Sequence, residues 1–321
     1  MRKVELRAID ALGLGSGDIV LDIGCGAGQT LLQLAARVGT EGRVIGVDVA
    51  PLLLEIARRR TAPLRQVRVI QADAQSLNLP AGSVDAVFSR FGVMTFNDPV
   101  AAFANFRRIL RPSGALAFTC WRSLQENALD HFPLSAAGVQ AAVDESPFSF
   151  ADPGHIRRTL ETAGFNEVTI QPHDEEVSSG DLDAMTWVLL KVGPLGKIIR
   201  ENPALRAAVE PLLRAALAAL GDPSRVGLLA SIWIVTARAG ARPGSGPFPR
   251  PRKSGRGDGR QAGNLNRTFG SAATRPPYTG SRDPPLVIPI PSITAICRVM
   301  IRMVALSTRP ITWPISVNLT V

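Results

Sequence analysis

Prediction of the fold begins with the segment Val20-Leu21-Asp22-Ile23-Gly24-Cys25-Gly26-Ala27-Gly28-Gln29-Thr30. The apolar run Ile19–Ile23, which carries one acid at Asp22, predicts a short buried strand. The alternating glycines that follow predict a sharp turn. An amphipathic helix is then predicted from apolar residues at spacings of three and four, namely Leu31, Leu32, Leu34, Ala35 and Val38. Strand, glycine turn and helix in this order are typical of the first unit of a doubly wound α/β fold.

The glycine turn also predicts a ligand, because backbone amides at a helix start favour a polar or anionic group. A dinucleotide loop has the pattern G-x-G-x-x-G, whereas here the third glycine, Gly28, comes one residue early. The G-x-G-x-G spacing, with an acid two residues before the first glycine, resembles motif I of class I S-adenosylmethionine-dependent methyltransferases. This resemblance implies a cofactor site at Asp22, Gly24, Gly26 and Gly28. The alternative is a tight structural turn without a ligand.

Two further strands are predicted to end near acids. The second strand covers residues 43–48 and ends in Asp48, which is placed to accept hydrogen bonds from both hydroxyls of an adenosine ribose. Its alternative role is that of a solvated turn residue or a helix cap. The third strand runs from residue 67 into an acidic turn. There Asp73 would accept a hydrogen bond from an adenine amine, and the amide of Ala74 would reach a ring nitrogen; the alternative is a simple turn residue.

Residues 73–114 strengthen the resemblance to the methyltransferases. A fourth strand is predicted over residues 83–89, followed by a helix capped by Asn97 or Asp98. Three pieces look like successive motifs of the methyltransferase group that includes quinone-biosynthesis C-methyltransferases, namely Asp73-Ala74, Phe88-Ser89-Arg90-Phe91-Gly92-Val93-Met94 and Leu110-Arg111-Pro112-Ser113-Gly114. By this resemblance Ser89 joins the cofactor-binding residues. The likeness runs from about Asp18 to Ala239 and is specific for the cofactor rather than for the substrate.

The rest of the first 240 residues completes the predicted fold. Residues 115–121, 167–171 and 231–237 are predicted as the fifth, sixth and seventh strands, with helices at 153–163, 181–192 and 203–220. The resemblance implies that the seventh strand is antiparallel and lies beside the sixth. The predicted fold class is therefore α/β, a Rossmann-like doubly wound sheet of seven strands, six parallel and one antiparallel, with helices on both faces. Residues 1–240 are predicted to be the methyltransferase domain.

Residues 241–321 differ from the rest in composition. They hold 12 Lys and Arg against two Asp and no Glu, so they account for a net charge of +10, while the whole chain carries +9. They also hold 8 Gly and 12 Pro, which favours a disordered or aberrant tail. One interpretation is an Arg-rich arm for nucleic acid or anionic lipid. We prefer the interpretation that this tail results from translation past the natural stop codon. Nucleic acid is therefore not an expected partner, despite the basic tail.

Truncation after Ala239 is expected to leave the melting temperature and the cofactor affinity unchanged. Such a segment buries too little apolar surface to offset an ordering entropy of about 1–2 kcal/mol per residue. Unfolding of the truncated chain would contradict this boundary. An Arg arm for nucleic acid predicts instead that the full-length chain binds DNA with strong salt dependence and that the truncated chain does not.

Composition also bounds the location of the protein. The three cysteines, Cys25, Cys120 and Cys297, show neither metal-ligand spacing nor a pairing pattern, so no metal is predicted and a reducing, cytoplasmic compartment is favoured. No apolar signal core opens the chain, and no apolar run reaches the ~18 residues of a membrane helix. We therefore expect no membrane association.

The resemblance implies S-adenosyl-L-methionine as the cofactor and in-line transfer of its activated methyl group to a small-molecule acceptor. This reaction needs alignment more than a protein nucleophile, so no catalytic residue is predicted. His131 lies in the expected acceptor region, residues 122–150, where a structural role is the alternative. Several residues there and nearby would form either an apolar acceptor wall or ordinary core, namely Phe91, Met94, Phe96, Trp121 and Phe132.

Two alternatives to a methyltransferase stay open. An NAD-dependent oxidoreductase is disfavoured by Gln29, which stands after the third glycine, and by the Asp73-Ala74 pair. A non-catalytic or damaged cofactor-binding protein is suggested by the unusual tail and by the short stretch of about 18 residues before the first strand, where the resemblance implies further helices. The acceptor, the methylated atom and the oligomeric state are not predicted.

Overall fold

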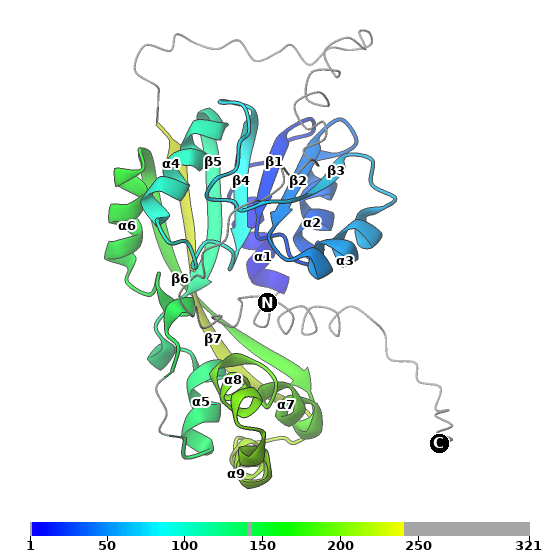
Figure 1. Cartoon of the computed structure of the whole chain (residues 1–321), viewed down its shortest axis with the longest axis vertical. Helices are drawn as coiled ribbons and strands as arrows, with labels where there is room; N and C mark the ends of the chain where they lie inside the picture. Colours follow the sequence, from blue (N-terminus) through cyan, green and yellow to red (C-terminus); the bar gives the residue numbers. More distant parts are fainter. Residues whose placement is uncertain (1, 140–142, 241–321) are drawn as a thin grey trace, which may run out of the picture. The chain divides into compact units, whose positions relative to one another are not determined.

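A single sheet of seven strands organises the part of the chain that the computed structural model describes, residues 2–139 and 143–240 (Figure 1). The strands lie side by side in the order β3-β2-β1-β4-β5-β7-β6. In chain order they are β1 (Ile19–Ile23), β2 (Arg43–Asp48), β3 (Val67–Gln71), β4 (Val84–Arg90), β5 (Leu110–Trp121), β6 (Phe165–Gly180) and β7 (Val226–Ala239). The described residues all belong to one unit of the chain.

The pairing of the strands confirms the predicted fold class. β1 pairs in parallel with β2 and β4, β2 with β3, and β4 with β5. β7 is antiparallel to both of its neighbours, β5 and β6. The sheet therefore has six parallel strands and one antiparallel strand, and its strand order reverses between β1 and β4. In open α/β sheets ligands bind at such a reversal, beyond the carboxyl ends of the strands.

Helices cover both faces of this sheet. The chain moves outward in opposite directions from β1 and from β4, and parallel crossovers are right-handed. The helices α2 and α3 therefore lie on the face opposite α4. The helix α1 contacts α2, and α6 contacts both α4 and β6. The helices are α1 (Arg2–Asp10), α2 (Gln29–Val38), α3 (Pro51–Thr61), α4 (Pro99–Ile109), α5 (Ala128–Ala136), α6 (Pro153–Thr162), α7 (Leu182–Leu189), α8 (Gly193–Glu201) and α9 (Arg206–Ala218).

Local sequence explains where these helices begin. Asp98 precedes Pro99 and accepts a hydrogen bond from the amide of Ala101 at 2.9 Å, so it is Asp98 rather than Asn97 that caps α4. Asp152 caps α6 in the same way through the amides of Gly154 and His155, as the sequence predicts for that helix start. Proline at the first helical position suits both helices, because that position needs no backbone donor.

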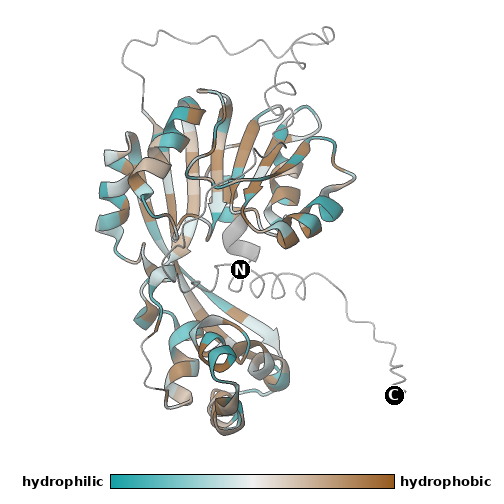
Figure 2. Cartoon of the chain, viewed as in Figure 1, coloured by the Kyte–Doolittle hydropathy of each residue, from teal (hydrophilic) through white to brown (hydrophobic). Residues whose placement is uncertain are grey.

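The core lies between the sheet and these helices. Figure 2 shows apolar residues concentrated in the central strands. On the α4 side the core is aromatic: Phe103 packs against Phe106, Phe118, Phe150 and Phe165 with ring centroids 5.5–6.5 Å apart. Aromatic packing of this kind adds to the area that each ring buries. This core packs α4 against β5 through Phe118 and against the start of β6 through Phe165.

The strands β6 and β7 are much longer than predicted. Their pairing runs from Phe165–Ala239 to Gly180–Val226, whereas β5 pairs with β7 only as far as Trp121–Ile232. This antiparallel pair of strands therefore continues beyond the carboxyl end of β5, where α5 contacts β7 and α7 contacts both strands. Exposed polar residues and Pro172 obscure the strand pattern in β6, but an edge strand tolerates a proline.

Several smaller predictions differ from the structure. Residues 111–114, whose proline, serine and glycine are typical of a turn, lie within β5, where the register with β4 shifts. On α3, Leu52 is 46% exposed although it is apolar, and Leu53 and Leu54 are the buried leucines. The helices α5 and α8 are not predicted as such. The predicted tail, residues 241–321, lies outside the described residues, so the structure leaves that prediction untested.

Among the helices of the described residues, none is long and apolar enough to cross a membrane.

Candidate functional site

The carboxyl ends of four neighbouring strands form the candidate site. The register places Ile23 of β1 beside both Val47 of β2 and Ser89 of β4, and it places Asp48 beside Gln71 of β3. Hence the glycine loop after β1 and the acidic ends of β2 and β3 lie along one edge of the sheet (Figure 1). The sequence predicts this convergence from the parallel order of the strands.

Backbone contacts fix the start of the glycine loop. The amides of Gly24 and Cys25 both donate to the carbonyl oxygen of Val47, at 2.8 and 3.0 Å. On the other side the loop abuts β4, because a Cβ on Gly24 would lie 2.8 Å from the Cα of Gly92. Ser89 is fully buried and donates to the carbonyl oxygen of Ile23 at 2.8 Å. The side chain of Ser89 therefore ties β4 to β1 beneath the loop.

The three glycines of the loop have different surroundings. Gly24 faces Gly92, and a Cβ on Gly28 would lie 3.0 Å from the Cβ of Ala57 on α3. Gly26 has a φ of +52° and open space, with no atom within 4 Å of the position that a Cβ would take. Two of the glycines thus permit close packing within the protein, while Gly26 leaves room for a ligand to approach the backbone.

Asp48 connects β2 to the glycine loop. Its side chain is 7% exposed, and its Oδ2 accepts a hydrogen bond from the amide of Gly26 at 2.9 Å. Its Oδ1 accepts one from the amide of Ala50 at 2.8 Å, as a turn residue would. Each carboxylate oxygen has two lone pairs, so both oxygens keep the capacity to accept a hydrogen bond from a ligand. The predicted ribose role and the alternative turn role are therefore compatible.

Asp22 is a buried acid directly below the loop. It is fully buried, and its Oδ2 accepts a hydrogen bond from the hydroxyl of Thr30 at 2.5 Å. Its Oδ1 has no hydrogen-bond partner among the described residues. Burial raises the pKa of Asp22 to about 7; the Thr30 hydrogen bond opposes this shift, and the nearby charge of Asp48 adds to it. A buried acceptor without a partner is the kind of group that a polar ligand or an ordered water satisfies.

Asp73 and Ala74 lie beyond β3, next to Asp48. The amide of Ala72 donates to the carbonyl oxygen of Asp48 at 3.2 Å, which anchors this segment to β2. Asp73 is exposed, and its Oδ1 accepts a hydrogen bond from the amide of Gln75 at 2.9 Å. This is the turn contact of the alternative interpretation, but the second carboxylate oxygen is engaged only weakly, at 3.4 Å from Gln75 Nε2. Ala74 is buried.

Two residues near the loop are missed by the sequence reasoning. Thr30 bonds to Asp22, and a hydroxyl in the first turn after the glycines is the signal that points to it. Arg60 Nη1 donates to the carbonyl oxygen of Ala27 at 2.7 Å. Arg58, Arg59 and Arg60 form a run of cations at a helix end, where solvated side chains are usual, but Arg60 is half-buried. Helical spacing from the buried Ala57 is the signal for Arg60.

Aromatic residues lie at the ends of β4 and β5. Phe91 has a φ of +56°, and its ring stacks on Trp121 with centroids 4.2 Å apart. Phe96 instead packs on Phe103 and Phe106 of α4 and so belongs to the core. His131 is exposed on α5. The structure thus brings the Phe91–Trp121 pair to the carboxyl edge of the sheet and does not bring His131 into contact with it.

No group of three or more His, Cys, Asp or Glu that could hold a metal occurs in residues 2–139 and 143–240. Cys25 and Cys120 are free and buried, and burial raises the pKa of the Cys25 thiol above its usual value. Asp130 on α5 is a second acid whose pKa burial raises, to about 7. The sequence offers no signal for Asp130, because α5 itself shows little periodicity.

Comparisons with known proteins identify the family of this chain. Residues 20–114, from β1 through the start of β5, match the family model described as a methyltransferase domain. The nocamycin O-methyltransferase of Saccharothrix syringae is 31% identical over 208 residues, which cover 58% of this chain and 74% of that protein. The aklanonic acid methyltransferase DauC of a Streptomyces species is 38% identical over 115 residues, which cover 35% of this chain and 52% of that protein.

Among solved structures, the YcgJ protein of Bacillus subtilis has the same fold, with a TM-score of 0.51 at 17% identity. The similarity covers 75% of this chain and 100% of that chain. The fold, the glycine loop and these relatives define a Rossmann-like methyltransferase. The chain belongs to the class I S-adenosylmethionine-dependent methyltransferases. It spans about half the length of DauC and of one further curated relative that it matches.

Proposed function

We propose that this protein moves the methyl group of S-adenosylmethionine to a small-molecule acceptor by in-line displacement. The observation that carries the proposal is the open space at Gly26, which is bordered by the buried carboxylate of Asp48 and by the start of α2. A side chain at position 26 would fill this space, and the glycine leaves it to a ligand. The amide groups at the start of α2 suit a polar ligand.

The residues present fit the cofactor. Asp48 would hold the ribose hydroxyls with its remaining lone pairs, and Asp73 and Ala74 would meet the adenine. Asp22 lies below the glycine loop, and its unpartnered Oδ1 would accept a hydrogen bond from the cofactor. The sulfonium of the bound cofactor supplies an already activated methyl group. The protein's contribution is then to hold the acceptor atom in line with that group at roughly 3–3.5 Å.

The acceptor is proposed to be a small apolar or aromatic molecule. The stacked rings of Phe91 and Trp121 stand at the carboxyl ends of β4 and β5, beside the glycine loop through Gly92. Such rings offer flat apolar surface for a planar acceptor. The relatives named as aklanonic acid and nocamycin methyltransferases support a small-molecule acceptor. Residues 1–240 are proposed to be the methyltransferase domain, because the seven strands of the sheet, from Ile19 of β1 to Ala239 of β7, lie within them.

Calorimetry with three ligands tests this proposal against an NAD-dependent oxidoreductase. Binding of S-adenosylmethionine and S-adenosylhomocysteine, without binding of NAD, supports the methyltransferase. Binding of NAD alone would overturn it. A methylation screen with a metabolite extract then distinguishes an active enzyme from a protein that only binds the cofactor, because only the enzyme transfers labelled methyl groups.

Asp48→Ala is expected to weaken the binding of S-adenosylhomocysteine by roughly 1.5–3 kcal/mol, the range for a hydrogen bond that involves a charged group. The loss has two sources, since the variant removes both the ribose acceptor and the acceptor of the Gly26 amide. Calorimetry measures the dissociation constant, and circular dichroism checks the fold.

Asp18→Ala is the matched control for Asp48→Ala. Asp18 Oδ2 also accepts a backbone hydrogen bond, from Gly15 at 2.7 Å, but it does so before the start of β1, at the opposite edge of the sheet. This control is expected to cost stability without a change in affinity. An unchanged dissociation constant for a folded Asp48→Ala variant would exclude the ribose assignment.

A further inference from the structure

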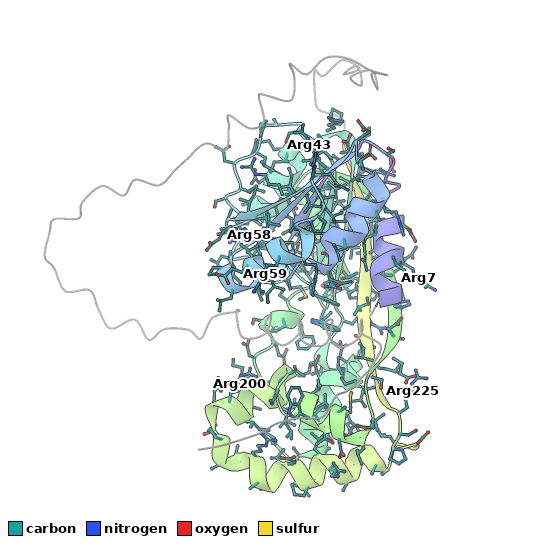
Figure 3. All side chains as sticks on the ribbon, turned by 90° about the vertical axis from the view of Figure 1, so that its right-hand side faces the viewer. Arg7, Arg43, Arg58, Arg59, Arg200 and Arg225 are labelled. Atoms are coloured by element: carbon teal, nitrogen blue, oxygen red, sulfur yellow. The ribbon has the colours of Figure 1, made fainter. Side chains whose placement is uncertain are left out.

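The helix α3 contacts the glycine loop through two residues one turn apart. Ala57 is buried and packs against Gly28, where a Cβ would come within 3.0 Å. Three residues later, Arg60 lies on the same face of the helix and reaches the loop with its guanidinium. The two residues that precede it, Arg58 and Arg59, are exposed and are labelled on α3 in Figure 3. Of the three arginines, therefore, only Arg60 has a hydrogen bond to the loop in the structure.

The bond from Arg60 fixes one peptide group of the loop. Its Nη1 donates to the carbonyl oxygen of Ala27 at 2.7 Å, a typical length for a charged donor. One residue earlier, the amide of Gly26 donates to Asp48 at 2.9 Å. A side chain of β2 thus binds the amide of Gly26, and a side chain of α3 binds the neighbouring carbonyl of Ala27. The loop is held where Gly26 faces the open space, before any ligand arrives.

We propose that Arg60 is a positioning residue for the cofactor site, which acts by holding the carbonyl of Ala27 and so the shape of the glycine loop. This inference rests on the proposed function, because it concerns the same ligand. Arg60 acts through the backbone and does not touch the ligand. Without its hydrogen bond, the loop would sample other shapes, and the ligand would have to order it on binding. The consequence is a weaker affinity rather than a different fold.

The test measures S-adenosylhomocysteine binding by calorimetry in the full chain and in three variants. Arg60→Met keeps the length of the side chain but removes the donor, and we expect its dissociation constant to rise about tenfold. Arg60→Lys keeps one charged donor, which is sufficient for a single carbonyl, so its affinity is expected to stay within about threefold. Arg59→Met is the matched control, because Arg59 is exposed on the same helix, and its affinity is expected to stay unchanged.

Thermal melting of the ligand-free variants separates positioning from folding. Weak binding by Arg60→Met, rescue by Arg60→Lys and similar melting temperatures support the inference. Wild-type affinity in Arg60→Met overturns it. Equal loss in both Arg60 variants together with a lower melting temperature also overturns it, since the residue would then support folding alone. If the wild-type chain itself does not bind S-adenosylhomocysteine, it is the proposed function that fails, and the inference falls with it.

Discussion

Gly26→Val is expected to abolish S-adenosylhomocysteine binding, with a loss of about 3 kcal/mol or more, equivalent to at least about a hundredfold in affinity. The reason is steric: the open space at Gly26 is where the ligand would approach the backbone, and a β-branched side chain would occupy it. Because no atom lies within 4 Å of the added Cβ, the substitution has room at this position, and the sheet is expected to fold. Calorimetry and circular dichroism measure the two effects separately.

Gly82→Val provides the matched control for this variant. Gly82 also has a positive φ, +66°, and no atom within 4 Å of an added Cβ. It lies in the turn before β4, at the amino end of the strand and away from the glycine loop. Valine in this backbone region costs roughly 1–2 kcal/mol at either position. Full binding by Gly26→Val would show that the loop is only a structural turn.

The parallel half of the fold could be predicted from sequence because its signals are local. The strands β1, β2 and β4 are short apolar runs, and such runs are typical of strands that helices cover on both faces. Aspartate followed by proline marks the starts of α4 and α6, since both residues satisfy the helix start by themselves. Neither signal depends on distant parts of the chain.

The long antiparallel pair of β6 and β7 and the helix α5 could not be predicted in the same way. β6 is an edge strand that pairs only with β7, and the less exposed alternate residues of its outer half are mostly polar, so the sequence shows no apolar alternation there. The start of α5 is set by long-range contacts: the fully buried Asn127 accepts a hydrogen bond from the amide of Ser231 at 2.7 Å. Such tertiary contacts override weak local propensity.

For the candidate site, the sequence predicts the positions of the residues better than their individual contacts. It groups Gly24, Gly26 and Gly28 as cofactor residues, while the structure places two of them against other parts of the protein. It also includes Ser89, whose hydroxyl bonds to the backbone of Ile23. A sequence motif shows only which residues occur together. The different surroundings of the three glycines become apparent only from the packing of Gly92 and α3 against the loop. The cofactor roles of these residues remain predictions.

The stability of this protein is expected to fall as pH rises, because of Asp22. Burial raises the pKa of Asp22 from 3.8 to about 7, and the neighbouring charge of Asp48 contributes to the rise. Between these values the folded state keeps a proton that the unfolded state releases, so the free energy of unfolding decreases with pH. From about pH 5 to about pH 8 the expected decrease is about 3 kcal/mol, and above about pH 7 it levels off.

Asp22→Asn is expected to remove this decrease, because asparagine does not ionise and its oxygen can still accept the hydrogen bond of Thr30. Urea unfolding of both proteins across the pH range measures the difference, in which contributions from groups that do not interact with Asp22 cancel. Two further variants should move the pKa of Asp22 in opposite directions: Thr30→Val raises it by removing a hydrogen bond to the charged form, and Asp48→Asn lowers it by removing a like charge. Parallel curves for wild type and Asp22→Asn would mean that Asp22 stays ionised in the folded protein. Its unpartnered Oδ1 would then require a buried water or cation as partner.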